Sequence, residues 1–310
     1  MILLNSAVGN FIKTDGKKYS YFAGNDYLGL ANHPEVKKAA IKAIKLYGVN
    51  FAASRRTTGT SNIHIELEQQ LASFKNKQNA VVFASGYLGN SILLDILRPV
   101  YSAVYVDQQA HSSIINSIPG NIKTVYCYNH CDPNHLETLL EQNKETNPLV
   151  ITDGIFALTG EIAPLDKIYA LVKKFSGMLV VDDAHSTGIL GKTGKGTPEY
   201  FNLPNDENIY QTETMSKALG SYGGFISGSG GLVDLIREKS ATYQASTALP
   251  PSIIGASLAS LKIINDNPEL RLLLLKKSNE LRNEIETLGF HINGNGTPII
   301  PILFSNAEQA

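Results

Sequence analysis

Cysteine is scarce in this sequence: its 310 residues contain only Cys127 and Cys131. Two cysteines cannot build a disulfide framework, so we expect a reducing compartment, the cytoplasm. A formal net charge of −1 leaves no electrostatic footprint for nucleic acid or an anionic membrane surface. Long apolar runs are also missing, since none approaches the roughly 20 residues that span a bilayer. We therefore expect a soluble protein with no nucleic-acid partner and no membrane partner.

Short apolar runs alternate with helical patterns through the middle of the chain. The runs predict strands at 80–84, 103–107, 123–127, 149–152, 178–182, 208–213 and 224–228. Helical patterns lie at 87–98, 111–117, 133–143, 165–175 and 231–243. A buried strand followed by a helix, repeated, indicates a mostly parallel sheet covered by helices on both faces. The expected fold class is therefore α/β.

The flanking regions differ from this block. Residues 34–75 are predicted to contain two helical segments, one opened by His33-Pro34-Glu35 and another whose apolar face carries Leu67, Leu71 and Phe74. Helices at 252–265 and 268–288 follow Pro250-Pro251. FHI (290–292) and TPIIPILF (297–304) are predicted to form two short strands. We divide the chain into an N-terminal segment with a linking helix (1–50), a large domain (51–255) and the start of a small α+β domain (256–310).

The strongest local signal is TETMSKALGSYGGF (212–225), in which Lys217 follows a predicted strand among small residues. Taken alone, the segment is most simply a surface lysine in a glycine-rich turn. A lysine amine can also form a Schiff base with an aldehyde if burial or a neighbouring cation lowers its pKa. Polar residues at the ends of the other predicted strands indicate which of these two interpretations is correct.

One such end is DDAHSTGILGKTGKG (182–196), where two acids and a histidine follow an apolar run. Ligands bind at the carboxyl ends of strands in open α/β sheets. There the carboxylate of Asp182 would keep a pyridine ring nitrogen protonated, and His185 could donate to the ring's phenolic oxygen. This pair suggests the ring of pyridoxal phosphate (PLP).

Other segments supply the remaining parts of a PLP site. Ser85, Gly86 and Tyr87 fall at a strand-to-helix turn, where backbone N–H groups can hold phosphate. Thr214 adds a hydroxyl, and His111 follows a strand that ends at Asp107, in position to stack on the ring. A lone histidine at a strand end usually belongs to the core or surface, so the prediction depends on all the pieces together.

The chain resembles the α-oxoamine synthases, a branch of the fold-type I PLP-dependent enzymes. The matching motifs are NDYLGLANHPEV (25–36), SRRTTGTSNIHIELE (54–68), ASGYLGN (84–90), HSSI (111–114), DDAHSTGILGKTGKGT (182–197), TMSKALGSYGG (214–224) and STALPPS (246–252). They cover residues 20 to 255 in family order. The resemblance implies a fold-type I domain followed by a smaller α+β domain.

The resemblance also assigns a role to each matching residue. Lys217 matches the Schiff-base lysine, and Asp182 matches the partner of the pyridine nitrogen. His185 matches the contact to the phenolic oxygen, and His111 matches the stacking histidine. The phosphate or ring contacts match Gly86, Tyr87 and Thr214, and Asn25 matches an active-site asparagine. Thr247 matches a phosphate ligand that the family takes from a neighbouring subunit. This implies a homodimer with shared active sites.

Family members join a small amino acid to an acyl-CoA or another acyl thioester and release CO2. Lys217 would act as the general base, with Asp182, His111 and His185 as the other catalytic residues. NDYLGL and VDDAHSTG are most similar to the 8-amino-7-oxononanoate synthases of biotin biosynthesis. The 2-amino-3-oxobutyrate CoA ligase and serine palmitoyltransferase types remain alternatives, as does an inactive PLP-binding homologue that serves as a dimer partner. HSSI together with DDAHSTG disfavours aminotransferase or aldolase chemistry.

Three features depart from the family pattern. No arginine precedes NDYLGL, Ala157 stands where most members have an active-site serine, and the last arginine, Arg282, does not match the carboxylate-binding arginine. We therefore expect an incomplete small domain of an otherwise normal enzyme. A naturally shortened protein with altered catalysis is the alternative.

A further group, Cys127, His130, Cys131 and His135, has the spacing C-x2-H-C-x3-H. We interpret it as a strand that ends and a helix that begins, with Asp132 as the N-cap before Pro133. No metal site is predicted from this spacing.

Overall fold

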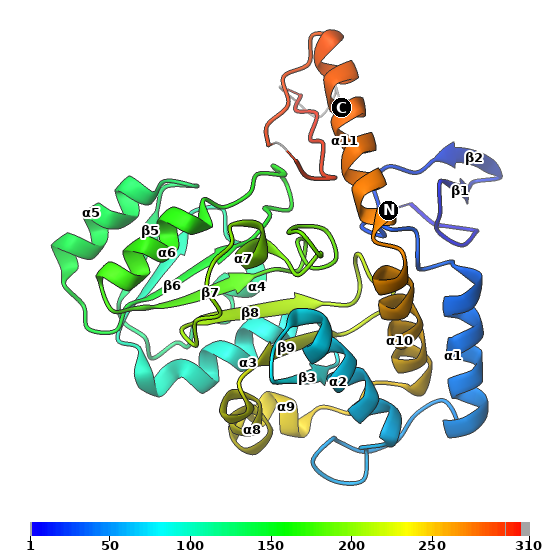
Figure 1. The fold of residues 1–310 in the computed structure, drawn as a ribbon, viewed down its shortest axis with the longest axis horizontal. Coiled ribbons are helices and arrows are strands. Elements are labelled where there is room, and N and C mark those ends of the chain that lie inside the picture. Colours follow the sequence, from blue (N-terminus) through cyan, green and yellow to red (C-terminus); the bar gives the residue numbers. More distant parts are fainter. Residues whose placement is uncertain (1, 295, 305–310) are drawn as a thin grey trace. The chain divides into compact units, whose positions relative to one another are not determined.

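A computed structural model describes residues 2–294 and 296–304 (Figure 1). Its main sheet contains β3 (Asn79–Phe83), β4 (Val104–Asp107), β5 (Val125–Tyr128), β6 (Leu149–Asp153), β7 (Met178–Asp182), β8 (Ile209–Thr214) and β9 (Gly224–Gly228). The strand order is β3-β9-β8-β7-β6-β4-β5. β4 pairs in parallel with β5 and β6, β6 pairs in parallel with β7, and β3 pairs antiparallel with β9. The expected mostly parallel α/β sheet is confirmed.

All seven predicted strands are present, with ends within two residues of the predicted ones. Every residue of β6 (LVITD) and β7 (MLVVD) is buried, as in strands covered on both faces. Because such runs are continuous and bounded by turn residues, they can be read from sequence.

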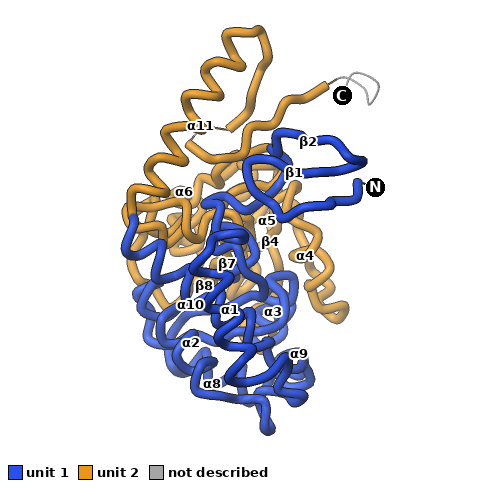
Figure 2. Tube along the Cα trace, turned by 90° about the vertical axis from the view of Figure 1, so that its right-hand side faces the viewer, with its two compact units in different colours: residues 1–96, 212–267 blue, residues 97–211, 268–310 orange. Residues whose placement is uncertain are grey.

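The chain forms two compact units, shown in different colours in Figure 2. Unit 1 comprises residues 1–96 and 212–267. Its helices are α1 (Pro34–Tyr47), α2 (Asn62–Lys75), most of α3 (Tyr87–Leu97), α8 (Gly230–Lys239), α9 (Ala241–Ala245) and α10 (Pro251–Asp266). α2 and α8 pack on β3 and β9, and α10 packs against α1 and α2. Leu67, Leu71, Met215 and Phe225 are buried in its core.

Unit 2 comprises residues 97–211 and 268–310. Its helices are a 3-10 turn (Arg98–Val100), α4 (Ser112–Ile115), α5 (Pro133–Asn143), α6 (Leu165–Lys174), α7 (Thr197–Tyr200) and α11 (Glu269–Thr287). α6 buries Leu165, Ile168 and Val172 along one side, the stripe expected of an amphipathic helix. Asp132 accepts the N–H groups of Asn134 and His135, which confirms it as the N-cap of α5.

Three predictions about secondary structure are wrong. FHI and TPIIPILF form no strand in the described residues 290–292 and 297–304. Backbone carbonyls in this region accept hydrogen bonds from a side chain and not from a neighbouring strand. Arg282 donates to the carbonyls of Asn293 and Ile299, both at 2.9 Å. The single helix predicted at 231–243 is two helices, because Ser240 ends α8 and caps α9.

A two-stranded sheet precedes the motifs and was not predicted. β1 (Phe11–Thr14) pairs antiparallel with β2 (Lys17–Ser20) across Asp15-Gly16. Both turn residues have positive φ, 48° and 72°. An Asp-Gly pair is a strong hairpin signal, so the sequence did carry the information.

The predicted domains 1–50, 51–255 and 256–310 remain a prediction. They are a different division of the chain from the two compact units. Among the described helices, none has the length and apolar character to cross a membrane.

Candidate active site

Gly86 occupies the turn between β3 and α3 in unit 1, close to Thr214 at the end of β8. A Cβ built on Gly86 would stand 2.8 Å from both Cβ and Oγ1 of Thr214, so the position requires glycine. The first turn of α3 follows at once, with the Tyr87 N–H donating to Ser85 Oγ at 3.3 Å. N–H groups at the start of an 11-residue helix favour an anion. The turn is therefore suited to a phosphate group.

Thr214 orders the loop that leads to Lys217. Its hydroxyl donates to the Gly223 carbonyl at 3.0 Å and accepts the Ser216 N–H at 3.1 Å. Ser216 Oγ also lies 2.7 Å from Thr214 Oγ1. Thr214 thus has a defined structural role, and its predicted direct contact with phosphate remains a prediction.

Lys217 is half-buried in a tight loop after β8. Its carbonyl accepts the Gly220 N–H at 2.8 Å, and Ser221 N–H donates to the Met215 carbonyl at 2.9 Å. Gly220 has φ +58°, and a Cβ there would lie 2.3 Å from the Ala31 nitrogen. The small residues around Lys217 are therefore needed for the close backbone packing that fixes its position.

Asn25 and Thr247, the other predicted residues of unit 1, are exposed. The backbone around Thr247 is anchored, because Thr247 forms an isolated antiparallel bridge with Ser54 and the Ala248 N–H donates to the Ala53 carbonyl at 3.0 Å. The Asn25 carbonyl accepts the Tyr27 N–H at 2.9 Å. Both side chains are held on ordered backbone and accessible.

In unit 2, Asp182 is the last residue of β7 and only 8% exposed. Its register partner is Asp153, the last residue of β6. The Ala184 N–H donates to Asp182 Oδ1 at 3.1 Å. Two carboxylates thus lie at the carboxyl ends of adjacent parallel strands, the edge at which α/β proteins bind ligands. A buried carboxylate at this edge is a suitable partner for a cationic ring N–H.

His111 and His185 also belong to unit 2, and they differ in exposure. His185 is buried, whereas His111 is exposed and caps the short helix α4. His111 Nδ1 lies 2.8 Å from Ser113 Oγ and accepts the Ser113 N–H at 3.2 Å, so its ring orientation is fixed. The His111 backbone N–H donates to Asp153 Oδ2 at 2.9 Å.

Sequence reasoning missed Asp153 and Asp183. Asp153 ends LVITD as Asp182 ends MLVVD, and this parallel was the available signal. Asp183 is fully buried and accepts from Thr197 Oγ1 at 2.6 Å and Gln211 Nε2 at 2.7 Å. Because Gly196 also lies against Asp183, this carboxylate holds both ends of the glycine-rich loop that follows Asp182.

The residues present fit PLP. Gly86 provides a turn at a helix start that packs against Thr214 too closely for any side chain, Asp182 a buried carboxylate, and Lys217 a half-buried amine. Arg282 is 3% exposed and donates to backbone carbonyls, so it is not available to a substrate carboxylate. This agrees with its mismatch to the family's carboxylate-binding arginine.

Comparison with known proteins gives one consistent result. The family model for aminotransferase class I and II matches residues 17–310. The 8-amino-7-oxononanoate synthase of Geobacter sulfurreducens is 36% identical over 306 residues, which cover 97% of this chain and 78% of that protein. The enzyme of the same name from Lysinibacillus sphaericus is 38% identical over 297 residues, covering 96% and 76%.

Solved structures give the same family. A serine palmitoyltransferase from S. paucimobilis, solved with bound PLP and myriocin, superposes with a TM-score of 0.92 at 26% identity, covering 99% of this chain and 81% of that one. The fold is thus that of the fold-type I PLP-dependent transferases. The chain belongs to the aminotransferase class I and II family of PLP-dependent enzymes, within its α-oxoamine synthase branch.

Proposed function

We propose that this protein condenses a small amino acid with an acyl thioester, in the manner of an 8-amino-7-oxononanoate synthase. The overall reaction converts an amino acid and an acyl thioester into an aminoketone, CO2 and a free thiol. The observation that carries the proposal is the match to relatives of that name over 97% and 96% of this chain, and 78% and 76% of theirs, at 36% and 38% identity. The resemblance implies that the thioester is an acyl-CoA. The alternative thioester substrate is one carried by an acyl-carrier protein.

The residues would divide the work as follows. When bound, PLP supplies an electron sink for negative charge that develops on the amino acid's Cα. Asp182 would hold the proton on the ring nitrogen, because a buried anion favours a cationic partner. The N–H groups at Gly86 and Tyr87 would bind the phosphate. His185 would donate to the phenolic oxygen, and His111 would cover the ring.

Lys217 would hold the cofactor covalently and then move protons. Its Nζ would take the Cα proton of the bound amino acid and later return a proton to the same carbon. The tight loop fixes the backbone of Lys217 and so limits the positions that its amine would reach, as a general base requires. Asn25 would lie near the bound substrate.

We propose a homodimer in which Thr247 binds the phosphate held by the partner subunit. Its exposed side chain on anchored backbone supports a role outside its own chain. The low cysteine content supports a cytoplasmic location.

The test follows thiol and CO2 together. Purified PLP-loaded protein is incubated with glycine, alanine or serine and an acyl-CoA, and free thiol and carboxyl-labelled CO2 are measured. We expect equal amounts of both products, with alanine the best substrate, and neither product from Lys217→Ala. Amino-group transfer to a keto acid without thiol release would contradict the proposal. PLP binding without any product would favour the inactive homologue.

A further inference from the structure

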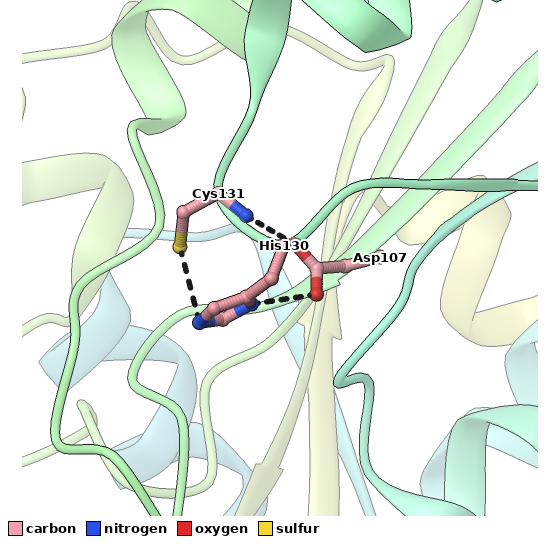
Figure 3. Close-up of side chains that lie close together, drawn as sticks. All are labelled: Asp107, His130 and Cys131. Atoms are coloured by element: carbon pink, nitrogen blue, oxygen red, sulfur yellow. Dashed lines mark hydrogen bonds and ion pairs between the residues drawn. The ribbon is translucent and has the colours of Figure 1, made fainter.

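The cluster around His130 is independent of the proposed reaction and lies entirely in unit 2 (Figure 3). The atoms of Asp107, His130 and Cys131 that could ligate a metal all lie within 4.8 Å of one another. Asp107 ends β4, and His130 and Cys131 follow β5. Glu161 joins them from the turn after β6. The carboxyl ends of three adjacent parallel strands, in the order β6-β4-β5, therefore contribute to one place.

His130 is oriented through its Nδ1 side. Nδ1 lies 2.8 Å from Asp107 Oδ1, and the ring packs edge-on against Phe156 with centroids 4.3 Å apart. Asp107 is 1% exposed, so its carboxylate is a strong and stable acceptor for the Nδ1–H. This hydrogen bond assigns the Nδ1 proton to Asp107, so Nε2 is the ring nitrogen that a metal ion can bind in place of a proton.

Asp107 is already occupied as an acceptor. Its Oδ1 also accepts the Gln109 N–H at 2.8 Å, and its Oδ2 accepts the Cys131 N–H at 2.9 Å. With three donors on one carboxylate, Asp107 is better suited to support a ligand than to be one. A carboxylate that holds the distal N–H of a metal-bound histidine is a recurrent outer partner in zinc sites.

Two ligand-type atoms face the other ring nitrogen. Cys131 Sγ lies 3.7 Å from His130 Nε2, and Glu161 Oε2 lies 3.3 Å from it. Tetrahedral zinc, with Zn–N of about 2.05 Å, Zn–S of about 2.3 Å and Zn–O of about 2.0 Å, would put these pairs about 3.6 Å and about 3.3 Å apart. Both observed distances agree with such a centre.

We propose that His130 Nε2, Cys131 Sγ and Glu161 Oε2 bind a thiophilic divalent cation of the zinc class, with Asp107 as the outer partner of His130. The nitrogen, sulfur and oxygen set favours Zn²⁺ over Mg²⁺ or Ca²⁺, which prefer oxygen ligands alone. Glu161 is one-third exposed, so solvent can reach the site and supply a fourth ligand. Cys127 and His135, which complete the sequence spacing, are not part of it: Cys127 is exposed and His135 Nδ1 accepts the Asn129 N–H at 2.9 Å.

The experiment uses the PLP-loaded 310-residue chain from which metal has been stripped. Co²⁺ is titrated in as a spectroscopic probe and displaced with Zn²⁺, and bound zinc is measured after gel filtration. We expect one Zn²⁺ per chain, a thiolate-to-cobalt charge-transfer band, and loss of both in Cys131→Ser and His130→Gln. Cys127→Ser is the matched control and should bind as the wild type does. Asp107→Asn should weaken binding by about 10- to 100-fold.

A second readout uses the single remaining thiol of Cys127→Ser. Zn²⁺ should slow the reaction of Cys131 with a disulfide reagent at least tenfold, and adding His130→Gln should remove this protection. Thermal unfolding of each apo variant checks that it folds. The proposal fails if the wild type binds no stoichiometric zinc, if Cys131→Ser binds zinc as the wild type does, or if Cys127→Ser loses it.

Discussion

Gly86 shows how single side-chain atoms define the proposed phosphate cradle. The space that a Cβ would need there is taken by Thr214, whose hydroxyl is itself fixed by Gly223 and Ser216. Since Thr214 cannot move without breaking those hydrogen bonds, the cradle tolerates no added atom. Residues 84–90 are predicted from sequence to form a phosphate-binding turn, and the structure adds the reason for the glycine.

Gly86→Ala should lower PLP affinity by about 10- to 100-fold, because forcing one methyl group into a packed site costs about 1–3 kcal/mol. Equilibrium titration with PLP measures this. Gly231→Ala is the matched control, since a Cβ there meets no atom within 4 Å. Equal PLP affinity of Gly86→Ala and the wild type would refute the described cradle.

His64 is a buried neutral side chain in the SNIHIELE motif. Burial of the ring lowers its pKa to about 4, with a smaller contribution from the positive charge of Arg55. Its Nδ1 lies 2.9 Å from Ser61 Oγ and accepts the Ser61 N–H at 3.3 Å, so the ring closes the N-terminus of α2.

Because the folded pKa lies below the unfolded value of about 6.5, the unfolded chain takes up the proton first as pH falls. The stability that neutral His64 contributes is complete above about pH 6.5 and declines by about 3 kcal/mol as pH falls toward about 4. Urea unfolding of the wild type and His64→Asn at several pH values measures it. The stability difference between the two proteins should shrink by this amount on acidification, and a pH-independent difference would contradict the assignment.

At the scale of elements, the loop between β7 and α7 depends on Asp183. This carboxylate accepts from the backbone and hydroxyl of Thr197 and from Gln211, all in the interior of unit 2. The loop therefore returns to the end of β7, where Asp182 lies.

Asp183→Asn should destabilise the protein by about 2–3 kcal/mol, since an amide N–H would face donors at a buried position. Chemical denaturation reports the change. Asp166→Asn removes the same charge from an exposed position in α6 and should change stability by less than about 0.5 kcal/mol. Similar losses in the two variants would show that charge, and not the hydrogen-bond network, is responsible.

Whether a helix or strand can be predicted from sequence depends on which groups satisfy its backbone hydrogen bonds. β6 and β7 were predicted because continuous buried runs ended in polar turns. TPIIPILF was mispredicted because an apolar run forms a strand only beside a partner, and here Arg282 and Thr297 make the hydrogen bonds. Asp107 at the end of β4 and Glu161 in the turn after β6 reach His130 from distant parts of the sequence, which no local spacing could reveal.

At the scale of the whole molecule, the proposed homodimer makes a prediction about Thr247. If each Thr247 serves the partner's cofactor, the defects of Lys217→Ala and Thr247→Asp fall on the same site of a mixed dimer. One site then carries both defects and the other carries neither.

Co-expression of the two inactive variants should therefore restore up to about a quarter of the wild-type activity, since about half of the dimers are mixed and each has one intact site. Thiol release from acyl-CoA measures the recovery. If Thr247 served its own chain, every site would be damaged and co-expression would restore nothing.

The central claim is that Lys217 carries the cofactor. PLP-loaded protein is reduced with borohydride and digested, and the modified peptide is sequenced by mass spectrometry. We predict one cofactor adduct per chain, on Lys217. An unmodified Lys217, or an adduct confined to another lysine, would contradict the account.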